Sequence, residues 1–304
     1  MRKPWIAGVL LAGLLLGGCG DPASGPEASP PVPAAPGASH SPSSTTHQRP
    51  AASPSVSAKR PTVLYLGDSL AMENQNVLGQ SLRDEVRARY TSAPYSGTTL
   101  CDYLEGTTKK SLVPAADKAA ALVRSLHPDY VVLQFWGNSW GYTPCMDGIT
   151  YDKARATYLS RYASDADRLA DQIATAGGSR RPTIVWVLQG PDPITPERVR
   201  KVNAVYEKRA AASGDLVADA GKTVSPASGR YTWAQELPCT SYERKHSAYC
   251  TQPGRGRTEL HRDDDYLHFC LAPTTSKPKP CPVRSSGILR FAREITRVIS
   301  DHVR

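Results

Sequence analysis

The sequence lacks several features that would place it in other classes of protein. Its 304 residues hold one long apolar run, close to the N-terminus, so no second membrane segment is expected. No two of its seven cysteines form a CxxC pair, which argues against a zinc site. It has only three phenylalanines and no long apolar loop, so nothing suggests the apolar lid of a lipase. No internal repeat is present.

The N-terminal residues resemble a bacterial export signal. Two basic residues precede the apolar run Ile6–Leu16, whose 11 residues are too few to span a bilayer but suit a signal-peptide core. The ending LGGC, at Leu16–Cys19, resembles a lipobox, in which the cysteine is lipidated and the preceding peptide is removed. We therefore predict a signal peptide at 1–18 and a lipid anchor at Cys19, on the outer face of a bacterial cell membrane. An ordinary secretory signal with a chance cysteine is the alternative.

The segment that follows differs in composition from the rest of the chain. Residues 20–60 are rich in Pro, Ala, Ser, Gly and Thr and have no apolar periodicity, so they cannot bury enough surface to fold. We predict a disordered tether at 19–60, and about 40 residues at roughly 3 Å each could reach on the order of 100 Å. The folded domain is expected at 61–304.

The remaining six cysteines indicate an oxidising compartment. An even number behind a signal peptide favours three disulfides, although sequence alone allows about 15 pairings of six cysteines. The preferred pairing is Cys101–Cys145, Cys239–Cys250 and Cys270–Cys281, and the last two close short local loops.

The charge balance is basic but scattered. The chain has a formal charge of +9, and a basic loop lies at Lys245–Arg257. Outside the cell no nucleic-acid partner is expected. Anionic wall polymers, lipid head groups or simply a solvated basic face remain open.

Apolar runs and helical stripes alternate along the domain. The runs Thr62–Leu66, Tyr130–Trp136, Thr183–Leu188 and Asp215–Asp219 are typical of strands that are buried on both faces. Stripes at helical spacing predict helices between and after these runs, with these marker residues: Leu78, Leu82, Val86 and Tyr90; Ala119, Leu122, Val123 and Leu126; Tyr158, Tyr162, Leu169 and Ile173; Val199, Val202 and Tyr206; and Ile288, Ala292, Ile295 and Ile299 after a cap at Ser285–Ser286. Such alternation predicts a doubly wound three-layer α/β/α sandwich with a parallel sheet, and residues 222–283 form a disulfide-braced excursion from it.

One strand-to-helix corner presents a single hydroxyl. The stretch YLGDSLAME, Tyr65–Glu73, places Ser69 at the carboxyl end of a strand, where it is either a helix cap or a nucleophile. A serine nucleophile needs a base and a group that orients the base. Asp265 and His268, three residues apart near the end of the chain, are the candidates. The backbone amides of Ser69 and Gly97 and the side-chain amide of Asn138 are candidate oxyanion donors.

These parts resemble the four blocks of the SGNH hydrolases, also called the GDSL family. They are GDSL around Ser69, the loop glycine Gly97, Gly137–Asn138, and Asp265-x-x-His268, in that order. The resemblance covers roughly 61–304, and the words GTTLCDY and LQFWGNS resemble secreted actinobacterial members. The third block commonly reads G-x-N-D, whereas here Gly137 directly precedes Asn138 and Ser139 follows.

The resemblance implies a flavodoxin-like sandwich and a serine esterase. Ser69 would be the nucleophile, His268 the base and Asp265 its orienter, with Ser69, Gly97 and Asn138 as oxyanion donors. The chain also lacks the last glycine of G-x-S-x-G, which disfavours the larger α/β-hydrolase fold.

The expected reaction is two-step acyl transfer through an acyl-enzyme. The expected substrate is a short-chain acyl ester, such as an O-acyl group on cell-envelope or environmental polysaccharide, and Trp136, Trp140 and Tyr142 could stack on a sugar or simply pack at the rim. An acyltransferase using the same site and a non-catalytic surface lipoprotein are the alternatives. We expect a monomer with no cofactor and no metal.

Overall fold

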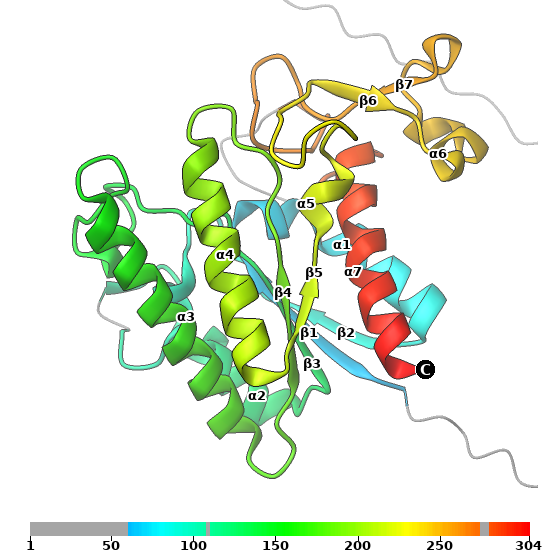
Figure 1. Ribbon diagram of the computed structural model, residues 1–304. Coiled ribbons are helices and arrows are strands. Elements are labelled where there is room, and N and C mark those ends of the chain that lie inside the picture. The colour runs from blue at the N-terminus through cyan, green and yellow to red at the C-terminus, as the bar shows by residue number, and fades with distance from the viewer. Residues whose placement is uncertain (1–59, 108–109, 274–279) are drawn as a thin grey trace, which may run out of the picture. The chain divides into compact units, whose positions relative to one another are not determined.

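Five parallel strands form the central sheet of the part of the chain that the structure describes. In this computed structural model (Figure 1) the described residues are 60–107, 110–273 and 280–304. The strands are β1 (Thr62–Gly67), β2 (Arg89–Ser92), β3 (Tyr130–Gln134), β4 (Thr183–Val187) and β5 (Leu216–Ala218), in the order β2-β1-β3-β4-β5. This order is that of the flavodoxin-like doubly wound sheets. The predicted fold class is therefore confirmed.

The N-terminal predictions are not tested by this structure. The signal peptide, Cys19 and the tether all lie outside the described residues. Within the described ranges, no helix combines the length and the apolar character needed to cross a bilayer.

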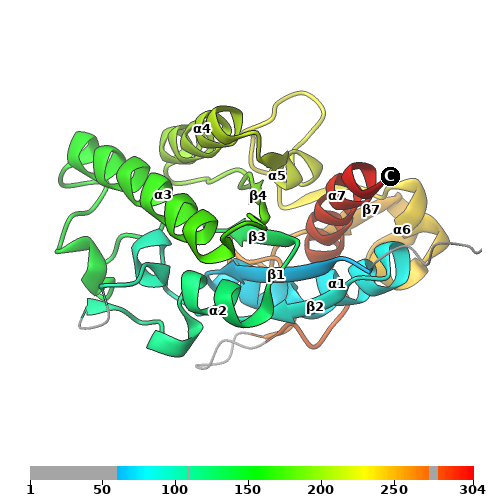
Figure 2. The same ribbon diagram turned by 90° about the horizontal axis from the view of Figure 1, so that it is seen from below.

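Side chains of each strand alternate between two apolar layers. Leu64 and Leu66 of β1 pack with α2 (Ala119–Leu126), α3 (Arg155–Gly177) and α4 (Pro196–Ser213). Val63 and Tyr65 of the same strand pack on the opposite face with α1 (Ser69–Val86) and α7 (Ser286–Val303). Figure 2 shows α3 and α4 on one side of the strands and α1 and α7 on the other. The three predicted layers are present, and the four helices marked by Leu122, Leu169, Val202 and Ile295 are confirmed.

The first predicted helix is shorter than its stripe suggested. Arg87 adopts a left-handed conformation (φ 57°), and the helix ends at Val86. The chain then turns back, and Tyr90 lies in β2, where it pairs with Val63 of β1 instead of continuing the helix. Assigning Tyr90 to the helix was therefore wrong. Tyr90 is apolar at the next i+4 position because it belongs to an edge strand and its side chain packs on the same helix.

The last helix begins where the sequence predicted it, but its first serine bonds elsewhere. Ser285 occupies the cap position of α7 and makes no side-chain hydrogen bond to the helix. Its hydroxyl instead accepts from the backbone amide of Leu271, at 3.0 Å. The cap position therefore anchors the segment that follows His268.

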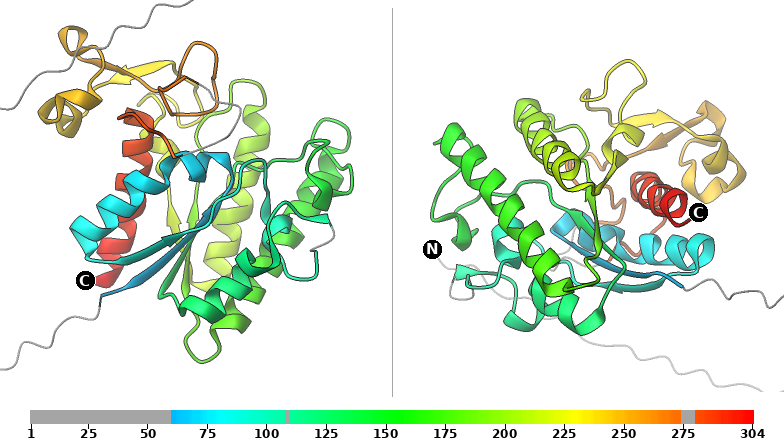
Figure 3. Two further views of the ribbon diagram at one scale, coloured as in Figure 1. Left: turned by 180° about the vertical axis from the view of Figure 1, so that it is seen from behind. Right: turned by 60° about the horizontal axis from the view of Figure 1, so that its bottom comes forward.

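The described part of the excursion at 222–283 lies at the carboxyl end of the strands. The short helix α5 (Ala220–Thr223) leads into it, and it contains α6 (Ser241–Lys245) and an antiparallel pair, β6 (Glu236–Pro238) with β7 (Arg257–Glu259). Figures 1 and 3 show β6, β7 and α6 at the end of the sheet where α1 begins. The structure contains the preferred disulfides, which join Cys101 to Cys145, Cys239 to Cys250 and Cys270 to Cys281.

Candidate active site

Ser69 is the first residue of α1, directly after β1. A side chain on Gly67 would lie 2.2 Å from the carbonyl oxygen of Gln134, so the tight corner requires glycine there. The buried carboxylate of Asp68 caps the helix and accepts hydrogen bonds from the backbone amides of Leu70 (3.0 Å) and Trp136 (2.7 Å). Asp68, and not Ser69, is therefore the cap, and the hydroxyl of Ser69 is left available for a partner.

That partner is His268. Its Nε2 lies 2.9 Å from Oγ of Ser69, although the two residues are 199 positions apart. Its Nδ1 lies 3.0 Å from Oδ2 of Asp265. Oδ1 of Asp265 also accepts from the backbone amides of Leu267 (3.1 Å) and His268 (3.0 Å), which fixes the turn. The structure thus brings together the serine, histidine and aspartate that the sequence singled out.

The charges around His268 favour its protonated form. Burial lowers the pKa of His268, but the hydrogen bond to Asp265 and the negative charges of Glu73, Asp265 and Asp68 outweigh burial and raise it from 6.5 to about 8. For Asp265, burial raises the pKa, but hydrogen bonds from the ring and amide of His268 hold it below its usual range. Asp265 is therefore ionised and can stabilise an imidazolium.

Glu73 is a site residue that the sequence analysis missed. It lies one helical turn after Ser69, is buried, and accepts from the backbone amides of Phe269 (2.9 Å) and Cys270 (3.1 Å). Burial raises the pKa of Glu73 to about 7, although the charge of His268 and the two amide bonds oppose this. Glu73 therefore fastens the residues after His268 to the helix that carries Ser69. The signal in the sequence was an acid four positions after the serine, on the apolar face of a helix.

His261 supports the same segment from another side. Its Nδ1 lies 3.0 Å from the carbonyl oxygen of His268 and must be the donor there. Its ring packs between Trp233 and Phe269. Burial lowers the pKa of His261 to about 4, so this support consists of a neutral ring.

We expect Glu73→Gln to change both the position and the pKa of His268. The amide would keep one acceptor but turn an N–H toward a backbone N–H, which costs about 1–3 kcal/mol of stability. Loss of the negative charge should move the pH inflection of kcat/KM below 8, and misplacement of the ring should lower kcat about tenfold. Glu85→Gln, an exposed acid on the same helix, is the matched control. An unchanged pH profile with unchanged kcat would refute the positioning role.

Gly97 lies in a loop that is hydrogen-bonded to the strand-to-helix corner that carries Ser69. It has a φ of +75°, which favours glycine, and a Cβ there would lie 3.0 Å from the ring of Tyr142. The backbone amide of Tyr95 (3.0 Å) and the hydroxyl of Tyr103 (2.8 Å) both donate to the carbonyl oxygen of Gly67. In the described part of the chain the backbone amides of Ser69 and Gly97 pair with no acceptor, so both are available to a ligand.

Asn138 contacts both the loop that contains Gly97 and the corner that carries Ser69. Its Nδ2 donates to the carbonyl oxygen of Thr98 at 3.0 Å and to Oδ2 of Asp68 at 3.4 Å. Its Oδ1 accepts from Nε1 of Trp140 at 3.1 Å, which fixes the orientation of the amide. One of its two N–H groups thus has a firm partner and the other only a long contact. The structure places this side chain beside Asp68, although the sequence of the third block, Gly137-Asn138-Ser139, departs from the common G-x-N-D.

A disulfide joins the two donor loops outside the corner. Cys101 lies in the turn η1 (Leu100–Tyr103) after Gly97, and Cys145 lies in the turn η4 (Pro144–Met146) after Asn138. The predicted pairing is confirmed. Within the described ranges, no cluster of three His, Cys, Asp or Glu side chains could hold a metal ion.

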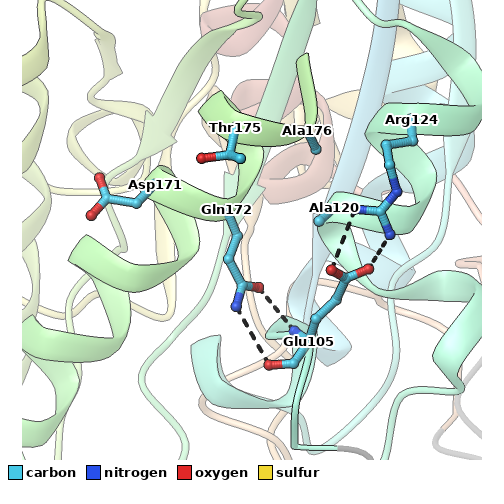
Figure 4. Close-up of a pocket in the computed structure, with 7 residues that line it drawn as sticks. All are labelled: Glu105, Ala120, Arg124, Asp171, Gln172, Thr175 and Ala176. Carbon is cyan, nitrogen blue, oxygen red and sulfur yellow. Dashed lines mark hydrogen bonds and ion pairs between the residues drawn. The ribbon is translucent and has the colours of Figure 1, made fainter. Parts of the chain in front are cut away.

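A separate hollow between η1, α2 and α3 has no comparable chemistry. Figure 4 shows Arg124 and Gln172 directed toward Glu105. The guanidinium of Arg124 pairs with the carboxylate of Glu105, and Oε1 of Gln172 accepts from its backbone amide at 2.9 Å. These three polar groups satisfy one another, and the residues that line the hollow include no histidine that could activate Thr175.

Comparisons with known proteins agree with this architecture only at a distance. No family model and no curated protein matches the sequence. Among solved structures, the periplasmic domain of a Salmonella Paratyphi A lipopolysaccharide acetyltransferase is similar at 11% identity (TM-score 0.46), with 80% of this chain and 84% of that chain covered.

Two further solved structures are similar at the same level. A family 3 carbohydrate esterase of Clostridium thermocellum shares 14% identity (TM-score 0.44), with 81% of this chain and 98% of that chain covered. A protein described as lipolytic and of the G-D-S-L family, from Desulfitobacterium hafniense, shares 14% (TM-score 0.43), with 79% and 99% covered. Likeness at this level carries no information about activity, which has to come from the geometry of the site.

Proposed function

We propose that this protein is an extracytoplasmic serine esterase that hydrolyses short-chain acyl esters. The observation that carries the proposal is the chain of contacts from Ser69 through His268 to Asp265, at 2.9 Å and 3.0 Å. A surface serine has no need of an imidazole on one side and an ionised carboxylate behind that imidazole. These contacts are the ones that a serine nucleophile needs.

The reaction would begin with attack by Ser69 on the ester carbonyl carbon. Nε2 of His268 takes the hydroxyl proton as Oγ forms its bond, and Asp265 stabilises the imidazolium. The negative oxygen that develops would be met by the free backbone amides of Ser69 and Gly97. Asn138 would add its second N–H by giving up the 3.4 Å contact with Asp68.

Collapse of this intermediate then releases the alcohol. His268 gives its proton to the leaving oxygen, and an acyl-enzyme remains on Ser69. Water, activated by the same imidazole, attacks the acyl carbon and releases the acid. A sugar hydroxyl in place of water would make the protein an acyltransferase, so the two activities differ only in the second step.

The surroundings of the reaction follow from the rest of the chain. Three disulfides are expected in an oxidising compartment, and the predicted anchor and tether would hold the domain within reach of the cell envelope. We therefore propose O-acyl groups of envelope or environmental polysaccharide as the natural esters, with the protein acting as a monomer without a cofactor.

An ester panel graded by acyl length tests the proposal. The p-nitrophenyl esters of acetate, butyrate and octanoate should be hydrolysed with kcat/KM falling about tenfold or more from the first to the last, since steric rejection in a pocket is worth about 10–200-fold. Products formed with a sugar acceptor in competition with water distinguish the esterase from the transferase. Absence of turnover on every ester, with no acyl-enzyme trapped, would leave only the non-catalytic lipoprotein.

A further inference from the structure

A second cavity lies directly beside the Asn138 loop. It has a volume of about 250 Å³ and lies between the segment after β3 and the first turn of α4. Its walls include Ser139, Trp140, Gly141, Asp152, Lys153 and Arg198. The volume is just below the range of pockets that hold drug-sized ligands, about 300–1,000 Å³, so the cavity suits a small ligand such as a single ring.

Trp140 belongs both to this cavity and to the candidate active site. Its Nε1 donates to Oδ1 of Asn138 at 3.1 Å, while its ring stacks on Trp136 with centroids 6.4 Å apart. The backbone amide of Trp136 in turn donates to Asp68, next to Ser69. Trp140 is 44% exposed, so its outer face is open to a ligand. A molecule that packs on Trp140 therefore lies next to the oxyanion donors.

The charges of the lining cancel. The buried guanidinium of Arg198 pairs with Asp192 (3.1 Å) and lies 3.6 Å from the ring centroid of Trp136. Arg198 also donates to the carbonyl oxygen of Gly137 at 2.8 Å. Its charge is thus already neutralised by Asp192 and its N–H groups support the loop, so it is not available to bind an anionic ligand. The exposed pair Asp152 and Lys153 is neutral in sum. An uncharged ligand with hydroxyl groups suits this lining better than a phosphate or a carboxylate does.

We propose that this cavity is a subsite for an uncharged sugar ring of the glycan that carries the ester. The apolar face of the ring would pack on Trp140, and its hydroxyls would bond to the polar side chains Ser139, Asp152 and Lys153. The subsite rests on the proposed esterase function of Ser69. It would orient the ester toward Ser69 and would favour a sugar ester over a simple ester.

Gly141 is a position at which a larger side chain can be added to the wall of the cavity. It is exposed, and a Cβ added there would meet no atom within 4 Å. Since Gly141 lines the cavity, Gly141→Trp should reduce the space in it. Gly254→Trp is the matched control, because Gly254 is an exposed glycine of the excursion where an added Cβ would also meet no atom within 4 Å. The measured quantity is kcat/KM for mono-O-acetyl cellobiose divided by kcat/KM for p-nitrophenyl acetate. This ratio should fall about tenfold or more in Gly141→Trp and remain at the wild-type value in Gly254→Trp.

Direct binding gives a readout that does not depend on turnover. Cellobiose titrated into the Ser69→Ala protein should quench tryptophan fluorescence, and the quench should be lost when Gly141→Trp is added. Equal ratios in Gly141→Trp and Gly254→Trp, or no cellobiose binding, would overturn the subsite. If wild type hydrolyses neither ester, the esterase function has failed, and the subsite is then decided by the titration alone.

Discussion

Ser69→Ala is expected to lower kcat/KM on short-chain esters by about 10⁴-fold or more. The variant removes the atom that forms the acyl-enzyme, and the loss of one member of such a triad leaves only the catalysis supplied by binding and the oxyanion donors. The side chain of Ser69 lies outside the cap of α1, which Asp68 provides, so the variant should fold with an unchanged melting temperature. Initial rates on p-nitrophenyl acetate measure the effect.

Covalent labelling identifies the nucleophile independently of rates. A fluorophosphonate probe should label the wild-type protein once and should not label Ser69→Ala. Ser247→Ala, an exposed serine in the excursion, should retain both labelling and turnover. Labelling or full turnover in Ser69→Ala would show that another residue is the nucleophile and would end the proposed mechanism.

Asp265→Asn is expected to lower kcat about 10³–10⁴-fold. The amide cannot stabilise an imidazolium, and it favours the tautomer of His268 that has no free electron pair facing Ser69. Asp264→Asn is the matched control, because this exposed acid forms a surface ion pair with Arg262 and such pairs contribute about 0–1 kcal/mol. A loss of activity in Asp264→Asn as large as that in Asp265→Asn would contradict the assignment.

The pH profile provides a second test of Asp265. Because His268 must be neutral to accept a proton and its pKa is about 8, wild-type kcat/KM should rise with pH and level off above 8. In Asp265→Asn the residual activity should have its inflection at lower pH, since the bond and charge that raise the pKa are gone. An inflection that stays near 8 in this variant would mean that another group titrates.

Stability should follow the opposite course with pH. The folded-state pKa of His268, about 8, lies above its ordinary value of 6.5, so the protonated ring stabilises the fold fully below 6.5 and this contribution is lost as pH rises through 8. Glu73, whose pKa is raised from 4.5 to about 7, likewise destabilises the fold as it ionises between these values. The protein is thus expected to be most active at pH values where its site is least stabilised.

The sequence predicted the interior of the sheet better than its edge. Runs such as Val131–Leu133 are apolar on both faces because the strands are buried between two helical layers, and this pattern predicts an interior strand of a parallel sheet. Strand β2, with the sequence RYTS, has no such run. It is a strand only because β1 offers it hydrogen-bonding partners, such as Tyr65 opposite Ser92. Pairing of this kind depends on tertiary contacts that local periodicity does not record.

The site was predictable where its chemistry is local. Asp265 and His268 are three residues apart, and a turn that brings the carboxylate to the imidazole follows from that spacing alone. Glu73 acts through backbone amides 196 and 197 positions away, and His261 acts through a carbonyl oxygen. Backbone groups have no identity in a sequence, so only the fold could show what these two side chains bind.

The pairing of α1 with α7 ties the nucleophile to a helix that is synthesised long after it. Ile288, Ile295 and Ile299 of α7 pack in one apolar cluster with Leu78 and Leu82 of α1, and Figure 3 shows the two helices side by side. In a nascent chain that does not yet include α7, this face of α1 is exposed to water, and the corner at Ser69 lacks the packing that holds it in place. Ribosomal synthesis from the N-terminus therefore delays assembly of the triad until α7 has emerged, and a product that is truncated before α7 should be inert.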